Sequence, residues 1–241
     1  MHAQVKRYLD VRRGRVAGLV ALEGRWALER ARAAGVEIEA VITCPALLRG
    51  DGPDDATVEV GEKTFRRLVA RDGPDGVASI ARVPTPTLDG LEPGDRILVA
   101  DGVESPGNIG TLIRTADGAA AAAVIVCDTS LRVSNPALVR APMGAVLWVP
   151  VVVTTVVEAR AWLRAHDVRA IAADPAAPTS YRRAEYGPPV ALVVGNERRG
   201  LTGGWGTTVA IPMLGRSDSL NVGHAAALLL YEALHQQARR T

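Results

Sequence analysis

Short runs of aliphatic and β-branched residues alternate with amphipathic segments along most of the chain beyond residue 95. The apolar runs predict strands at 96–100, 122–127, 147–153, 168–173, 190–195 and 208–212. Apolar positions three and four residues apart predict helices at 108–118, 135–145, 155–166 and 221–238. Because strands such as AVIVC and VALVV are apolar at every position, we expect an α/β fold whose mainly parallel sheet has helices on both faces.

The first 85 residues predict a smaller α/β unit with shorter elements. Polar and basic residues at 1–15 predict a short helix or arm, and helical spacing then runs from Trp26 to a stop at Gly35. Strands are predicted at 36–44, 57–60 and 76–83, with a helix at 62–72. Closely spaced prolines and an Asp-Gly pair follow, which is typical of a linker. We therefore expect a first domain at 1–85, a linker at 86–94 and a second domain at 95–241.

The composition is that of a globular protein with a sizeable core, since 48% of the 241 residues are hydrophobic and 22% are charged. The formal net charge is only +2, but Lys6 and Lys63 are the only lysines, so arginine carries almost all the positive charge. Arginine binds phosphate groups better than lysine does. The codon bias of a GC-rich genome explains the same excess, so arginine content does not by itself indicate an RNA partner.

Cysteines, histidines and apolar runs exclude several classes of protein. Cys44 and Cys127 lie far apart inside apolar runs, which indicates free thiols in a core rather than a disulfide. The four histidines are scattered without metal-ligand spacing, so we expect no metal. No apolar run reaches the roughly 18 residues of a membrane span and no signal peptide is evident, so we expect a cytoplasmic protein without a membrane partner.

Three glycine-bearing turns carry the candidate chemistry. They lie in DGVESPGNIGTLIRTA at 101–116, LVVGNERRGL at 192–201 and IPMLGRSDSLNVGHAAALLLYEAL at 211–234, and in each case a predicted buried strand runs into the polar turn. Ligands bind beyond the carboxyl ends of parallel strands, where glycines allow close approach of the backbone. The chain lacks GxxxxGK[ST] and GxGxxG motifs, which argues against nucleoside triphosphates and NAD. The turns suit a neutral or zwitterionic ligand whose adenine edge bonds to main-chain groups.

These turns resemble the motifs of the SpoU/TrmH branch of the SPOUT RNA methyltransferases. The resemblance covers about 95–238, and the N-terminal unit more loosely. The residues that match are Asn108, Gly110 and Arg114 in the first motif, Gly195, Asn196, Glu197 and Gly200 in the second, and Ile211, Pro212, Met213, Ser219, Leu220, Asn221 and Val222 in the third. Arg140 and Gly144 fit a further Arg-x-x-x-Gly helix of the family. Arg198-Arg199 and Gly223-His224 depart from the usual pattern.

The resemblance implies a specific fold and activity. The fold has a C-terminal trefoil knot, and the N-terminal unit is similar to an L30e-like RNA-binding extension. The cofactor is S-adenosylmethionine, the reaction methylates a ribose 2′-hydroxyl in RNA, and the enzyme is a homodimer. We expect rRNA rather than tRNA because a separate unit precedes the catalytic domain. The segment SIARVPTP and the GNIG turn are similar to antibiotic-resistance members that modify 23S rRNA.

The resemblance also implies residue roles. The expected catalytic residues are Arg114, Asn108, Glu197, Ser219 and Asn221. The expected cofactor-binding residues are Leu192, Gly195, Asn196, Gly200, Ile211, Met213 and Leu220. The family proposal makes the arginine a base, but guanidinium scarcely deprotonates, so a role in orienting phosphate and hydroxyl is equally compatible. The asparagines and the serine are also suited to capping helices.

Other functions stay open at this stage. A tRNA 2′-O-methyltransferase would share every motif. A non-catalytic RNA-binding protein could keep the knot, although the retained polar residues argue against it. An α/β small-molecule binder unrelated to RNA would require the triple motif match to be chance.

Overall fold

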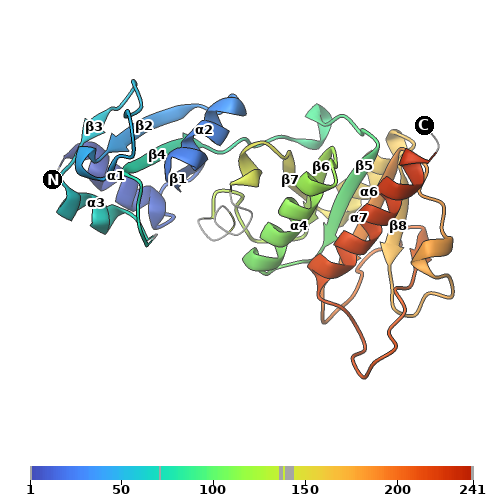
Figure 1. The fold of residues 1–241 in the computed structure, drawn as a ribbon. Helices are drawn as coiled ribbons and strands as arrows, with labels where there is room; N and C mark the ends of the chain where they lie inside the picture. Colours follow the sequence, from blue (N-terminus) through green and yellow to red (C-terminus); the bar gives the residue numbers. More distant parts are fainter. Residues whose placement is uncertain (1, 71, 136–137, 139–143, 240–241) are drawn as a thin grey trace. The chain divides into compact units, whose positions relative to one another are not determined.

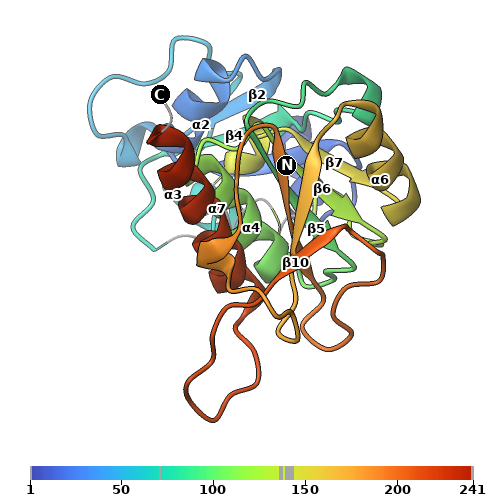
Figure 2. The same cartoon turned by 90° about the vertical axis from the view of Figure 1, so that its right-hand side faces the viewer.

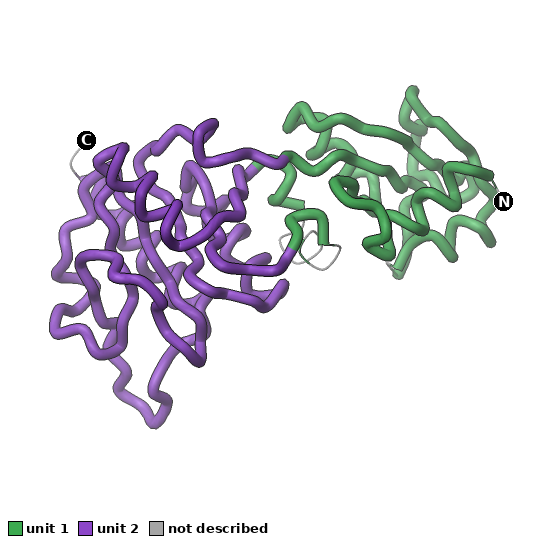
Figure 3. The backbone as a smooth tube through the Cα atoms, turned by 180° about the vertical axis from the view of Figure 1, so that it is seen from behind, with its two compact units in different colours: residues 1–84, 132–148 green, residues 85–131, 149–241 purple. Residues whose placement is uncertain are grey.

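The protein divides into two compact units in a computed structural model that describes residues 2–70, 72–135, 138 and 144–239. One unit comprises 1–84 with 132–148, and the other comprises 85–131 with 149–241 (Figure 3). The segment 132–148, which the sequence assigns to the second domain, thus groups with the first unit. The expected linker contributes to the second unit, because Leu88 and Leu91 pack against its core.

The first unit contains a mixed four-stranded sheet in the order β1-β4-β2-β3 (Figure 1). Its strands are β1 (Leu19–Glu23), β2 (Ile38–Thr43), β3 (Val58–Glu59) and β4 (Val77–Arg82), and its helices are α1 (Ala3–Arg12), α2 (Arg25–Ala33) and α3 (Glu62–Leu68). Tyr8 of α1 and Phe65 of α3 are fully buried with Ile42 and Ile80 of the sheet. Leu28 of α2 packs in a separate cluster with Val41.

The second unit contains a six-stranded sheet in the order β10-β8-β9-β5-β6-β7, and every neighbouring pair is parallel. The strands are β5 (Arg96–Asp101), β6 (Ala123–Cys127), β7 (Val151–Thr154), β8 (Arg169–Ala173), β9 (Val190–Gly195) and β10 (Thr207–Val209). The predicted parallel sheet is confirmed.

Helices cover both faces of this sheet, as the apolar strands predict. The helices α4 (Pro106–Gly118) and α7 (Val222–Ala238) pack against each other on one face, and α6 (Val156–Ala165) lies on the other (Figure 2). Along β5, Ile97 and Val99 pack with Leu163 of α6. Because side chains alternate along a strand, the residues between them face α4 and α7.

The predicted boundaries fail where proline or helical turns interrupt an apolar run. The strand expected at 147–153 begins only at Val151, after a 3₁₀ helix, η3 (Ala145–Leu147), and Pro150. The strand expected at 208–212 ends at Val209. The apolar segment at 19–22 forms β1, although the sequence did not identify it as a strand. Of the helix expected at 135–145, with Arg140, the structure describes only Asn135, Leu138 and 144–145.

Both cysteines are free and buried, as the sequence predicts. Burial, with smaller contributions from Asp101 and Asp128, raises the pKa of the Cys127 thiol to about 12. Among the described residues, no helix combines the length and hydropathy that crossing a membrane requires. In the same part of the chain, no three His, Cys, Asp or Glu side chains are grouped so that they could hold a metal ion.

Candidate active site

A pocket lies at the carboxyl ends of β8, β9 and β10, where they meet the start of α7. The empty space in the pocket, including the part open to solvent, amounts to about 680 Å³. Its walls are formed by Ala173, Asp174, Pro175, Val194, Gly195, Asn196, Glu197, Gly200, Ile211, Met213, Asp218, Ser219, Leu220, Val222 and Ala225. The second and third predicted turns therefore meet in one site.

The pocket includes six of the seven residues expected to bind a cofactor. These are Gly195, Asn196, Gly200, Ile211, Met213 and Leu220. Leu192 does not line it, because its side chain is fully buried within β9 on the face that α4 and α7 cover. The sequence missed the turn at 173–175 after β8, although Asp174-Pro175 following an apolar run is a turn signal.

The turn after β9 lines the pocket in part with the backbone of two glycines, Gly195 and Gly200. The amides of Asn196 and Gly200 each donate to the other's carbonyl, at 3.0 and 2.8 Å. A Cβ atom at Gly195 would lie 2.6 Å from the carbonyl carbon and oxygen of Gly200, closer than real Cβ contacts come. Glycine is therefore required here, because the backbone of Gly200 fills the space that a side chain would occupy.

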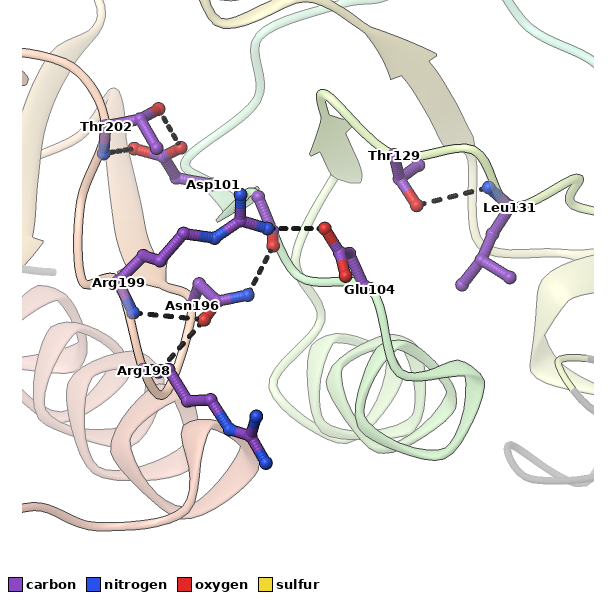
Figure 4. A network of polar contacts seen from close by, with 9 residues as sticks. Asp101, Glu104, Thr129, Leu131, Asn196, Arg198, Arg199 and Thr202 are labelled. Atoms are coloured by element: carbon purple, nitrogen blue, oxygen red, sulfur yellow. Dashed lines mark hydrogen bonds and ion pairs between the residues drawn. The ribbon is translucent and has the colours of Figure 1, made fainter.

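Asn196 joins this turn to the one after β5 (Figure 4). Its side-chain nitrogen donates to the carbonyl of Gly102 at 2.8 Å. Its side-chain oxygen accepts from the backbone amides of Arg198 and Arg199, at 2.9 and 3.1 Å. The side chain thus fixes the conformation of the loop, in addition to lining the pocket.

Asp101, which the sequence did not single out, anchors the next part of the loop. This fully buried carboxylate accepts from the amide and hydroxyl of Thr202 at 2.8 and 2.5 Å and from the indole nitrogen of Trp205 at 2.7 Å. Burying a carboxylate is costly unless donors satisfy it. An aspartate that ends an otherwise apolar strand was the available signal.

Three of the five expected catalytic residues come together beside the pocket. The side-chain nitrogen of Asn108 donates to Glu197. The side-chain nitrogen of Asn221 lies 3.2 Å from the side-chain oxygen of Asn108 and 3.5 Å from a carboxylate oxygen of Glu197. Asn221 also caps α7 by accepting from the amide of Gly223 at 2.9 Å. Residues from β5–α4, β9 and α7 thus share one polar cluster, and Ser219 lies in the adjoining pocket wall.

Arg114 does not join this cluster within one chain. It lies on the exposed side of α4, and its side chain has no hydrogen bond or ion pair with any residue in the described part of the chain. It does not line the pocket either.

The charges around the pocket favour a cationic ligand. Asp174, Glu197 and Asp218 contribute carboxylates to its wall, and the described residues add no lysine or arginine. Carboxylates attract a positively charged group and repel phosphates. The pocket is therefore unsuited to a nucleotide phosphate, as the sequence motifs also indicate.

Comparison with known proteins gives consistent matches. The SpoU rRNA Methylase family matches residues 95–231. The chain is 31% identical over 225 residues to the 23S rRNA (uridine(2479)-2′-O)-methyltransferase of Streptomyces viridochromogenes, covering 88% of this chain and 72% of that protein.

Solved structures match nearly the whole chain. The crystal structure of an RNA 2′-O ribose methyltransferase matches with a TM-score of 0.80 and 35% sequence identity. The match covers 98% of this chain and 96% of the chain in that structure. The AdoMet-bound rRNA methyltransferase from Sinorhizobium meliloti is 29% identical, with a TM-score of 0.83, over 97% of this chain and 95% of its own.

Proposed function

Because the chain belongs to the SpoU rRNA methylase family, we propose that it transfers a methyl group from S-adenosylmethionine to a ribose 2′-hydroxyl of 23S rRNA. The observation that carries this proposal is the juxtaposition of two features. A pocket lined by carboxylates and open backbone lies directly beside the polar cluster of Asn108, Glu197 and Asn221. The first can hold a cationic methyl donor, and the second can receive a ribose.

The residues of the pocket fit S-adenosylmethionine. Its sulfonium and ammonium groups are cationic, which matches the carboxylates of Asp174, Glu197 and Asp218. Its adenine edge can hydrogen-bond to main-chain groups, and Gly195 and Gly200, which have no side chains, line the pocket with backbone. Ile211, which also lines the pocket, supplies an apolar surface for the purine ring. When bound, the cofactor supplies an activated methyl group.

The protein's task is then to orient the attacking oxygen, whose proton is released to solvent as the methyl group is transferred. In our proposal, Asn108 and Asn221 hold the ribose, and Glu197 orients both asparagines through the hydrogen bonds that join them. Arg114 binds an RNA phosphate and orients the hydroxyl, because a guanidinium is a poor base but a strong partner for phosphate. Ser219 contributes a hydroxyl from the pocket wall.

We further propose a homodimer in which Arg114 of one subunit completes the site of the other. Leu228 and Tyr231 on the outer side of α7 are 38% and 50% exposed, although large apolar side chains of a helix are ordinarily buried. They lie on the helix that packs against α4, which carries Arg114. A second copy of the same surface would bury them and bring the arginine to a partner.

A trefoil knot is also part of the proposal. The chain leaves the sheet at β10, on one edge, and returns as α7 to pack against α4 and the more central strands β5 and β9. This return path supports a threaded C-terminal segment.

We propose that residues 1–85 form an L30e-like RNA-binding domain. Trp26 of α2 is 45% exposed, and the Arg30 guanidinium lies 5.2 Å from its ring centre and 5.6 Å from that of Trp148. Stacked aromatic and guanidinium groups suit unpaired bases of RNA. Weaker binding of 23S rRNA by Trp26→Ala than by the wild type would support this role, and unchanged binding would oppose it.

Mapping 2′-O-methyl groups in cells tests the substrate. We expect one additional 2′-O-methylated nucleotide in 23S rRNA when the protein is produced in a host that lacks it. A new methyl group in tRNA alone would identify a tRNA enzyme instead. No new methyl group, together with retained RNA binding, would indicate a non-catalytic RNA-binding protein.

A further inference from the structure

A second cleft adjoins the pocket and has a different charge. It encloses about 750 Å³, including its open mouth, and is lined by Glu104, Ser105, Asn196, Glu197, Arg198 and Arg199. Asn196 and Glu197 line both spaces. The cleft therefore begins at the proposed ribose site, and the two arginines are its only basic residues within the described part of the chain.

The backbone that carries the two arginines is fixed independently of their side chains. Asn196 accepts hydrogen bonds from the amides of both Arg198 and Arg199 (Figure 4). Any residue other than proline at these two positions could donate the same bonds. The loop conformation thus does not explain why arginine occupies both positions, and the side chains are free for another role.

The ion pair of Arg199 with Glu104 is readily exchangeable. It joins the turn after β9 to the turn after β5, but the two side chains are 64% and 62% exposed. Such exposed pairs contribute little to stability. A phosphate can displace the carboxylate, because guanidinium binds phosphate in a bidentate, charge-assisted manner. Arg198 has no side-chain partner among the described residues, so its charge is already available.

We propose that Arg198 and Arg199 bind a backbone phosphate of the RNA next to the target ribose, and that Glu104 holds Arg199 in place until RNA arrives. This inference rests on the proposed function, since it assumes that the polar cluster receives a ribose. A phosphate adjoins each ribose in RNA. Arg198 and Arg199 line a cleft that Glu197 of the polar cluster also lines, so both arginines lie beside the proposed ribose site. The carboxylates of Asp174 and Asp218, which line the first pocket but not the cleft, disfavour the same phosphate in that pocket.

The double variant Arg198→Gln/Arg199→Gln tests the proposal. We expect its affinity for 23S rRNA, measured by filter binding, to fall roughly ten- to hundredfold, since charge-assisted hydrogen bonds are removed. A plot of the logarithm of the RNA association constant against the logarithm of the salt concentration has a negative slope. Its magnitude should be smaller by about 0.7–0.9 for each phosphate that the variant no longer binds. The affinity for S-adenosylhomocysteine should not change. In methylation assays, KM for RNA should rise while kcat stays close to that of the wild type.

Two further variants make the result specific. Arg182→Gln/Arg183→Gln removes an equal charge from an exposed arginine pair outside the cleft and should leave RNA affinity within about twofold of the wild type. Glu104→Gln frees Arg199 and removes a repulsive charge, so it should increase RNA affinity severalfold at low salt. A purely structural ion pair would not give this increase.

Several results would overturn the inference. One is equal RNA affinity for the two double-arginine variants. Another is a change of the Arg198→Gln/Arg199→Gln protein from dimer to monomer in sedimentation, which would make the cleft a subunit contact. Because RNA binding is measured apart from catalysis, the inference can fail while the wild type methylates 23S rRNA. Conversely, a wild type that binds RNA through this cleft without methylating it would contradict only the proposed function.

Discussion

Gly195 lies where the wall of the pocket has no room for a side chain. Alanine would place its Cβ 2.6 Å from backbone atoms of Gly200, which cannot rotate away as a side chain could. We expect Gly195→Ala to shift the turn and to weaken binding of S-adenosylhomocysteine by at least about tenfold, at a cost of about 1–3 kcal/mol. Calorimetric titration measures the affinity. Gly215→Ala, in open space on the neighbouring loop, is the control and should bind normally.

Arg114 should separate chemistry from cofactor binding. Since it lies outside the pocket, Arg114→Ala should leave the affinity for S-adenosylhomocysteine unchanged. We expect kcat to fall by about a hundred- to a thousandfold, as for loss of a donor used in the transition state. Arg164→Ala, which removes an exposed arginine from α6, should retain normal kcat. Near-normal turnover in Arg114→Ala would exclude a catalytic role.

For individual residues, the sequence was sufficient to select candidate side chains but not to predict which groups they contact. The resemblance to the SpoU/TrmH motifs implied Asn108, Glu197 and Asn221, and the structure brings them together. It did not reveal that the side chain of Leu192 is buried inside the core, because it lies in the middle of β9, before the part of the strand that reaches the pocket. The buried role of Asp101 was also missed, since its partners lie about a hundred residues away in the chain.

The start of α7 positions the pocket through its close packing on α4. A Cβ atom at Gly223 would lie 2.6 Å from the Cγ2 methyl of Thr111. We expect Gly223→Ala to lower the free energy of unfolding by about 1–3 kcal/mol and to weaken cofactor binding, because Asn221 and Leu220 would move with the helix. Denaturant unfolding and titration measure the two effects.

Thr111→Ser provides the matched rescue, because it removes that methyl and keeps the hydroxyl that donates to the carbonyl of Gly107. The double variant Gly223→Ala/Thr111→Ser should recover part of both losses. If the double variant is no better than Gly223→Ala, contact with Thr111 is not the cause.

Elements were predictable where hydrophobicity was periodic and uninterrupted. The strands β5, β6, β8 and β9 occur within one residue of their expected limits because their apolar runs are continuous. The helix α3 is shorter than expected, because Val69 takes an extended conformation after Leu68. The local hydrophobic pattern does not predict where such a helix ends, because the end depends on how the last side chains pack in the folded protein.

For the whole molecule, the proposed shared site predicts complementation between two impaired chains. At a subsaturating concentration of S-adenosylmethionine, Arg114→Ala and Gly195→Ala should each have strongly reduced activity alone. In a heterodimer, the intact pocket of the first chain would meet the intact arginine of the second, so we expect roughly half of the wild-type activity per dimer. Differently tagged chains, co-expressed and purified through both tags, provide the sample. No recovery in verified heterodimers would mean that each subunit uses its own Arg114.

The division into units was only partly apparent from the sequence. Prolines near residue 85 marked a change of unit, which the structure places between Pro84 and Thr85. Nothing in the periodicity indicated that 132–148 would group with the first unit. The segment groups with that unit through tertiary contacts, including the one between Arg30 and Trp148.

The central claim is ribose methylation of 23S rRNA, and methyl transfer in vitro tests it most directly. Purified protein is incubated with S-adenosylmethionine carrying a radiolabelled methyl group and with unmodified 23S rRNA, tRNA serving as the parallel substrate. We predict label in 23S rRNA that remains in alkali-resistant dinucleotides, because a 2′-O-methyl group blocks cleavage of the adjoining phosphodiester. Label confined to mononucleotides would contradict the account. So would the absence of label when the same preparation binds S-adenosylhomocysteine in a separate titration.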